Sequence, residues 1–163
     1  GGSQGAQSLN KALREALPRI LPHMDVLHLC GKGNLDESLK GTPGYFQTEF
    51  LSGSLPDALA CADLVLSRAG ANALCEFAAL KKPMLLIPLP LSSSRGDQIL
   101  NAKSYRERGL ANVLPQEDLT ADTLVQALKK LANDAPKLRE ALANEPAADG
   151  TEAVLRLIEE ISR

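Results

Sequence analysis

Aromatic side chains and excess positive charge are both scarce in this sequence. Its 163 residues include no tryptophan, two tyrosines and three phenylalanines, and the formal net charge is −2. A nucleic-acid-binding protein needs a basic surface for phosphates and commonly uses aromatic rings to stack on bases. We therefore expect no nucleic-acid partner.

Long apolar runs are missing too. The longest, residues 83–91, contains three prolines and is about half the ~20 residues that a membrane-spanning helix needs. The opening segment, GGSQGA, lacks the charged and apolar regions of a secretory signal and does not begin with Met. We expect no transmembrane segment, and we expect the sequence to be a fragment or a processed form.

Paired cysteine motifs are absent as well. Cys30, Cys61 and Cys75 are odd in number, show no CxxC spacing, and each stands in an apolar segment. This pattern predicts buried free thiols in a reducing compartment rather than a zinc site or a disulfide scaffold. No metal ligand set is expected.

What the sequence does contain is the composition of one globular domain, with 44% apolar and 23% charged residues. Apolar periodicity and turn residues predict helices at residues 5–21, 55–62, 71–80, 97–108, 120–133, 137–143 and 151–161, and strands at 24–30, 45–51, 63–67, 84–88 and 111–114. This alternation is typical of α/β proteins. It predicts a doubly wound, Rossmann-like parallel sheet with helices on both faces.

The glycine-rich turn at residues 1–6 opens the first predicted helix. In a doubly wound domain a buried strand normally precedes such a turn, so we expect the parent protein to have a strand upstream. The turn is neither a Walker loop nor GxGxxG. Free N–H groups at a helix start can bind an anion, but a plain strand-to-helix turn that needs glycine explains the residues equally well.

A second turn of this kind, at residues 68–72, places Arg68 at the mouth of a helix and Asn72 in its first turn. Glu76 follows, and a carboxylate beside such a crevice can accept two ribose hydroxyls. The plainer alternative is a solvated helix glutamate with an arginine on a loop.

A third polar segment, residues 91–96, leads into a helix that begins with Asp97 and Gln98, with Asn101 one turn later. Carboxylate and amide groups bind the vicinal hydroxyls of a sugar well. Asp97 could instead be only a helix N-cap, whereas Gln98 has no obvious capping role.

Neither histidine is expected to be catalytic. His28 alternates within an apolar strand and His23 stands in a proline-flanked turn, so structural roles are favoured. The residues alone therefore predict a protein that binds a diphosphate-linked sugar or nucleoside and has no obvious general base of its own.

Six segments together resemble one glycosyltransferase family. They are GGSQGA at 1–6, HLCGKG at 28–33, TEFL at 48–51, SRAGA at 67–71 with Glu76 beyond it, PMLLIPLP at 83–90 and RGDQILNA at 95–102. In order and spacing they are similar to the C-terminal domain of the MurG family, the N-acetylglucosaminyltransferases of peptidoglycan synthesis. The resemblance implies the C-terminal half of a GT-B glycosyltransferase, with residues 1–163 forming a UDP-sugar donor-binding domain.

The resemblance also implies the ligand contacts of single residues. Glu76 would hold the ribose hydroxyls, the backbone of Leu51 would bind uracil, and Asp97 and Gln98 would hold the sugar. The diphosphate would meet Ser3 and the amides of Ala71, Asn72 and Ala73, with Arg68 nearby. Some members have a threonine where Ala73 stands; here only the backbone N–H can serve, and Asn72 is a candidate substitute.

The implied reaction is an inverting transfer of N-acetylglucosamine from UDP-N-acetylglucosamine to a lipid-linked muramoyl pentapeptide, without a required metal or other cofactor. Acceptor groove, membrane contact and base would belong to an N-terminal domain outside this sequence. The enzyme would be peripheral on the cytoplasmic face of the bacterial membrane, and the isolated domain inactive. Two alternatives stay open: a related GT-B transferase or epimerase using another UDP-sugar, and the donor-binding subunit of a split two-subunit transferase.

Overall fold

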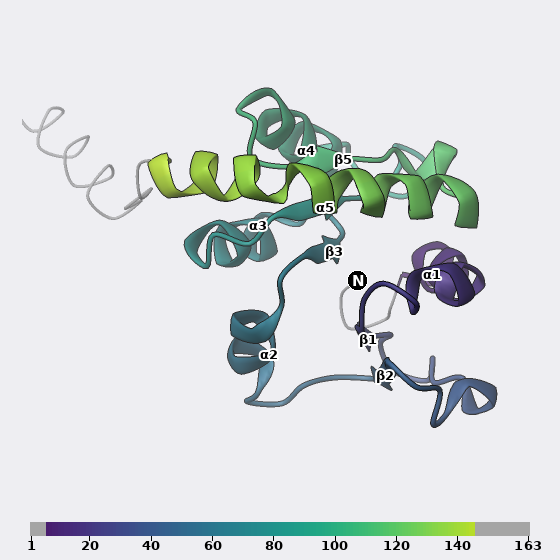
Figure 1. The fold of residues 1–163 in the computed structure, drawn as a ribbon. Coiled ribbons are helices and arrows are strands. Elements are labelled where there is room, and N and C mark those ends of the chain that lie inside the picture. The colour runs from purple at the N-terminus through teal and green to yellow at the C-terminus, as the bar shows by residue number, and fades with distance from the viewer. Residues whose placement is uncertain (1–5, 146–163) are drawn as a thin grey trace, which may run out of the picture.

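In the computed structural model, the described residues are 6–145. They form alternating helices and strands (Figure 1). The helices are α1 (Gln7–Ile20), α2 (Leu55–Cys61), α3 (Ala71–Ala79), α4 (Asp97–Glu107) and α5 (Ala121–Asn144), and the strands are β1 (Val26–Leu29), β2 (Tyr45–Thr48), β3 (Val65–Ser67), β4 (Met84–Leu86) and β5 (Asn112–Val113). Two short 3-10 helices, η1 (Glu37–Leu39) and η2 (Gln116–Asp118), complete the order.

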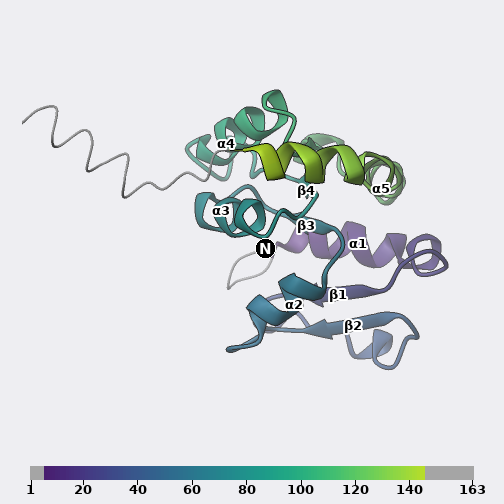
Figure 2. The same ribbon diagram turned by 60° about the vertical axis from the view of Figure 1, so that its left-hand side comes forward.

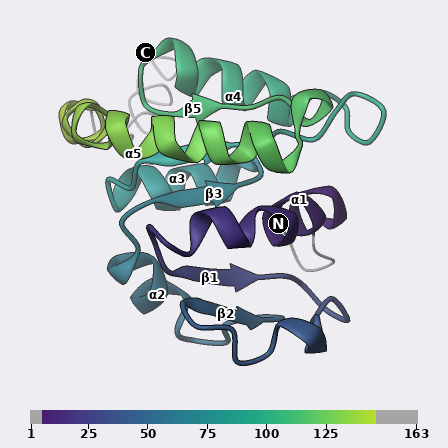
Figure 3. The same ribbon diagram turned by 45° about the vertical axis from the view of Figure 1, so that its right-hand side comes forward.

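Every strand pairing is parallel. β1 pairs with β2, placing Val26 opposite Tyr45, while β3, β4 and β5 form a second ladder in that order. Figures 2 and 3 both show α1 between the β1–β2 pair and β3, and no pairing joins β1 to β3 within residues 6–145. The predicted α/β fold with a parallel sheet is confirmed, although its hydrogen bonding forms two groups.

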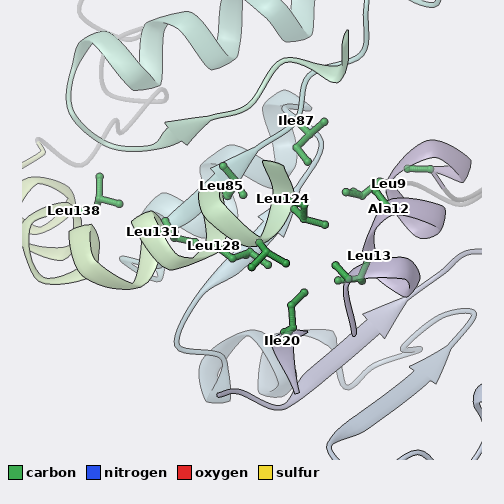
Figure 4. Packing of buried hydrophobic residues seen from close by; sticks show 13 residues of the cluster. Leu9, Ala12, Leu13, Ile20, Leu85, Ile87, Leu124, Leu128, Leu131 and Leu138 are labelled. Carbon is green, nitrogen blue, oxygen red and sulfur yellow. The ribbon is translucent and has the colours of Figure 1, made fainter. Parts of the chain in front are cut away.

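Strand β4 shows why helices cover both faces. Successive side chains of a strand point to opposite sides, so Leu85 packs with the core of α1 and α5, whereas Met84 and Leu86 pack with α3 and α4. Figure 4 shows the first of these cores, where leucines of α5 meet the apolar stripe of α1. Strand β4 is therefore buried on both of its faces, as is typical of a strand inside a parallel sheet.

Helix α5 corrects one prediction. Pro136 interrupts the apolar pattern, which predicts two helices at 120–133 and 137–143, but the structure has one helix through Asn144. Pro136 is on the exposed side, so it removes one backbone hydrogen bond while Leu131, Ala135, Leu138 and Leu142 continue the buried stripe. Packing outweighs the local break.

The cysteines correct another prediction in part. All three thiols are free, but only Cys30 is buried, whereas Cys61 and Cys75 are exposed. On α3 the core side chains are Leu74 and Phe77, which leaves Cys75 on the solvent face. An apolar segment in sequence thus does not fix which face of its helix a thiol occupies.

Two expectations concern the chain's ends. Helix α1 begins at Gln7 with Ala6 as its N-cap, later than the predicted start at residue 5. The glycine-rich turn at 1–5, with Ser3, and the predicted helix at 151–161 lie outside the described residues. Across residues 6–145, none of the helices has the length and apolar content to cross a bilayer.

Candidate functional site

Helix α3 begins directly after strand β3, through the turn at residues 68–70. Gly70 is its N-cap, and no side-chain cap hydrogen bond is present among the described residues. The first N–H groups of an α-helix have no acceptor inside the helix, so the amides of Ala71, Asn72 and Ala73 point outward as donors. Together with the helix dipole they form an anion-binding end.

Glu76 lies one turn further along α3, on the face that Asn72 also occupies because the two residues are four apart. Both side chains are exposed. The carboxylate is therefore open to a ligand that rests its anionic part on the first turn of α3. The buried side chains Leu74 and Phe77 fix the rotation of the helix that presents it.

Helix α4 follows β4 through the segment at residues 87–96. Its N-cap is Gly96, in the left-handed conformation with φ of 87°, and within the described part of the chain it has no side-chain cap. Asp97 is exposed in the first turn, so the alternative that Asp97 is the N-cap is wrong. The Gln98 side chain accepts a hydrogen bond through Oε1 from the Leu89 N–H at 3.2 Å, which leaves its NH₂ group to donate.

The N-terminus of α1 supplies a third helix start, with Ala6 as N-cap and no side-chain cap seen in residues 6–145. Ser8, in the first turn, accepts a hydrogen bond from Arg68 at 3.0 Å and donates one to Gln116 Oε1 at 3.1 Å. Sequence reasoning missed Ser8, because a polar side chain on the exposed side of a helix looks like ordinary solvated surface.

Arg68 connects these segments from the protein interior. Its side chain is only 8% exposed, so it is buried rather than open at the mouth of the turn. Nη1 donates to the carbonyls of Ile87 at 3.0 Å and Pro88 at 3.4 Å, and Nη2 donates to Ser8. Asn101 of α4 adds a bond to the Ala69 carbonyl at 3.0 Å. The starts of α1, α3 and α4 are thereby held close together.

Leu51 follows β2 in a loop that is tied to the turn after β1. The Gly33 N–H donates to Glu49 Oε1 at 2.5 Å, and the Thr48 hydroxyl donates to the Phe50 carbonyl at 3.0 Å. Leu51 is half-buried, and its own backbone makes no hydrogen bond within residues 6–145. Its N–H and C=O can therefore pair with a planar ligand.

His28 has the structural role expected from sequence. Asn10 donates through Nδ2 to the Cys30 carbonyl, so its Oδ1 accepts from His28 Nε2 at 2.9 Å, and His28 Nδ1 accepts from the Tyr45 hydroxyl at 2.8 Å. Burial, then the Arg14 charge, lowers the pKa of His28 to about 4. Asn10 could have been noticed as an amide within the apolar stripe of α1.

The structure thus brings some predicted residues together and leaves others apart. Arg68, Gln98 and the amides of α3 belong to one hydrogen-bonded set of segments. The side chains of Glu76 and Asp97, and the residue Leu51, make no hydrogen bond to it within residues 6–145. No group of three or more His, Cys, Asp or Glu side chains in the described ranges is placed to hold a metal ion. The first-turn amides of α3 can bind an anion, and the exposed carboxylates and the Gln98 amide can bind hydroxyl groups.

Comparison with known families agrees with this chemistry. The family described as "Glycosyltransferase family 28 C-terminal domain" matches residues 1–159. A protein of Lachnospira eligens is 48% identical over 163 residues, which are 100% of this chain and 46% of that protein. It is named UDP-N-acetylglucosamine--N-acetylmuramyl-(pentapeptide) pyrophosphoryl-undecaprenol N-acetylglucosamine transferase. A relative of the same name, numbered 2, from Bacillus thuringiensis subsp. konkukian is 49% identical over 99% of this chain and 45% of its own length.

Solved structures give the same result. The crystal structure of MurG from Acinetobacter baumannii matches with a TM-score of 0.80 and 27% identity, over 98% of this chain and 48% of that one. The glycosyltransferase of kitacinnamycin matches in fold, with a TM-score of 0.76 and 24% identity over 98% of this chain and 41% of that one. The chain spans about half the length of the curated relatives it matches.

Proposed function

Since this chain belongs to the glycosyltransferase family 28 C-terminal domain family, we propose that it is the donor-binding half of an N-acetylglucosaminyltransferase that uses UDP-N-acetylglucosamine. The observation that carries the proposal is the convergence of three helix starts without side-chain caps, those of α1, α3 and α4, at the carboxyl ends of the strands in the described structure. This is where open α/β sheets bind nucleotides.

The diphosphate lies on the first turns of α1 and α3. The amides of Ala71, Asn72 and Ala73 donate to its oxygens, and Ser3, outside the described residues, contributes its hydroxyl. Ala73 acts through its N–H alone, and the exposed amide of Asn72 supplies the side-chain contact that a threonine makes in some relatives. Helix dipoles add an attraction for the negative charge.

The nucleoside occupies the side of the site nearer β2. Uracil pairs with the free N–H and C=O of Leu51, and the Glu76 carboxylate accepts hydrogen bonds from the two ribose hydroxyls. The sugar extends toward α4, where Asp97 and Gln98 bind its hydroxyls. The contact between Gln98 Oε1 and Leu89 orients the amide so that its NH₂ group donates to the sugar.

In the reaction, the acceptor hydroxyl forms a bond to the anomeric carbon while the bond from that carbon to the diphosphate oxygen breaks with its electron pair. Negative charge then grows on the departing UDP, where the helix amides stabilise it more strongly than in the ground state. The acceptor's proton leaves to a base outside residues 6–145. This chain therefore contributes leaving-group stabilisation and orientation of the donor.

The acceptor proposed for the whole enzyme is the undecaprenyl-diphosphate-linked muramoyl pentapeptide, the substrate in the names of its relatives. Because that lipid resides in the membrane, we place the enzyme as a peripheral protein at the cytoplasmic membrane surface, with the acceptor bound by the part of the enzyme that these relatives have beyond this chain. Peptidoglycan synthesis, cell shape and division follow as its cellular setting.

Isothermal titration with UDP-N-acetylglucosamine and UDP tests the proposal. Binding of both is expected, and Glu76→Ala should weaken both by about tenfold or more, since the ribose hydroxyls lose a charged acceptor. Glu140→Ala, at an exposed position of α5, is the matched control and should bind like the native protein. UDP-glucose and UDP-galactose should bind more weakly than UDP-N-acetylglucosamine; equal binding indicates another donor, and no binding of UDP overturns the proposal.

A further inference from the structure

Arg68 is an arginine without a carboxylate partner in the described structure, although it is buried. Its hydrogen bonds go only to neutral oxygens, the Ser8 hydroxyl and the carbonyls of Ile87 and Pro88, and its Nε has no partner among residues 6–145. Burial lowers the pKa of the guanidinium. A buried charge that no opposite charge offsets is costly, so a fold that keeps one needs a reason.

The partners of Arg68 indicate the reason. Ser8 is in the first turn of α1, and Ile87 and Pro88 directly follow β4, at the beginning of the segment that leads to Asp97 and Gln98. Arg68 itself begins the turn that leads into α3. Arg68 thus stands at the start of one ligand-binding segment, the turn into α3. Its guanidinium bonds to the other two, the first turn of α1 and the segment after β4.

We propose that Arg68 is a positioning residue that sets the spacing between the diphosphate-binding helix starts and the sugar-binding segment, without itself touching the donor. This inference rests on the proposed function. The planar fork of arginine is suited to the task because Nη1 and Nη2 point in fixed directions toward β4 and α1.

Two neighbouring hydrogen bonds extend the same connection. Asn101 of α4 donates to the Ala69 carbonyl at 3.0 Å, and the Leu89 N–H donates to Gln98 at 3.2 Å. The side chain that binds the sugar is therefore attached to residues adjacent to those that Arg68 holds. A shift of β4 against α1 would move Gln98 relative to the diphosphate site.

Ligands of different length separate this role from a general structural one. Uridine reaches only Leu51 and Glu76, and α3 keeps its place through Leu74 and Phe77 in the core. UDP-N-acetylglucosamine spans all three segments. If the spacing between these segments is lost, UDP-N-acetylglucosamine therefore binds more weakly while the affinity for uridine is kept. General destabilisation of the protein lowers the affinity for both ligands.

Calorimetric affinities of uridine, UDP and UDP-N-acetylglucosamine for Arg68→Lys test the inference. Lysine keeps the charge but lacks the fork, so UDP-N-acetylglucosamine should bind about tenfold more weakly while uridine changes less than about twofold. Ser8→Ala, at an exposed helix position, removes the α1 contact of Arg68 together with the Ser8–Gln116 hydrogen bond, and should weaken UDP and UDP-N-acetylglucosamine by about threefold and spare uridine. Ser104→Ala, an exposed serine of α4, is the control and should bind all three like the native protein.

The inference is overturned if Arg68→Lys binds UDP-N-acetylglucosamine within twofold of the native protein, or if uridine and the long donor weaken equally. Where Arg68→Lys fails to fold, Ser8→Ala decides alone: a selective loss of the diphosphate ligands supports the role of Arg68, and native affinities refute it. If the native protein binds UDP without UDP-N-acetylglucosamine, the donor assignment fails, a result distinct from any effect of these variants.

Discussion

His28 of β1 and Tyr45 of β2, which lie two positions apart in the register of the paired strands, share a buried hydrogen bond of 2.8 Å between the imidazole Nδ1 and the phenol hydroxyl. The ring accepts this bond only while Nδ1 carries no proton. The neutral imidazole is thus built into the contact between α1 and the β1–β2 pair.

Acid should destabilise the fold through His28. Burial is the main reason that its pKa falls from the ordinary value of 6.5 to about 4 in the folded protein. The unfolded chain then binds the proton first, so stability is complete above pH 6.5 and falls as the pH drops toward 4. Between pH 7 and pH 5 the expected loss is on the order of 1 kcal/mol, allowing for solvent screening.

Urea unfolding at the two pH values measures this loss. His28→Gln should remove most of the difference between pH 7 and pH 5, although it lowers stability at both. His23→Gln, which changes the exposed histidine, should leave the native difference in place. A variant at position 28 that keeps the full pH dependence would assign the effect to other groups.

Gln98→Ala should separate sugar binding from nucleotide binding. In the proposed arrangement its amide binds the sugar, and in the variant the Leu89 N–H would lose its acceptor. The affinity for UDP-N-acetylglucosamine is expected to fall by about tenfold while that for UDP stays within about twofold, the difference being one to two hydrogen bonds. Gln126→Ala, on the exposed face of α5, is the calorimetric control. Equal loss of both ligands would move Gln98 out of the sugar site.

Gly96→Ala should strain the start of α4. Gly96 has φ of +87°, and an added Cβ would lie 3.0 Å from Leu91 Cδ2. Gly109→Ala is a matched control, since Gly109 has φ of +71° and open space around its Cβ position. Each should cost about 1 kcal/mol in thermal unfolding. Only Gly96→Ala should weaken UDP-N-acetylglucosamine relative to UDP; if both variants did so, the effect would reflect stability alone.

Pro136→Ala should stabilise the protein. Pro136 is exposed inside α5 and cannot donate the helix hydrogen bond that alanine restores, so a gain of roughly 1 to 3 kcal/mol in the free energy of unfolding is expected. Thermal or urea unfolding measures it, with Pro22→Ala, at an exposed turn position after α1, as the comparison. A loss of stability would show that the ring's own packing matters more than the missing donor.

Sequence patterns predict the helices and strands where local pattern and tertiary packing agree. Helix α3 matches its prediction within one residue because Leu74 and Phe77 mark its core face. The break expected at Pro136 is wrong, because the buried stripe on either side of it packs as one surface. The expected burial of Cys75 is wrong for a related reason. Successive residues of a helix point in different directions, even where the whole segment is apolar.

In the site, too, the sequence predicts the local features and misses those that depend on tertiary packing. Polar turns after strands predict the helix starts of α3 and α4, because both follow from local chain geometry. The interior position of Arg68 could not be read in this way, since it depends on Ser8, sixty positions earlier in the sequence. The ligand contacts of Ser3, Leu51, Glu76, Asp97 and Gln98 stay predictions.

The contrast between helix starts has a consequence for the stability of this domain. Helix α5, which carries none of the candidate site residues, begins with a capping box formed by Thr120 and Thr123. In the described structure α1, α3 and α4 have no such side-chain caps. A diphosphate bound as proposed would cap α1 and α3 together, so that occupancy satisfies their free N–H groups and we expect the empty domain to be the less stable form.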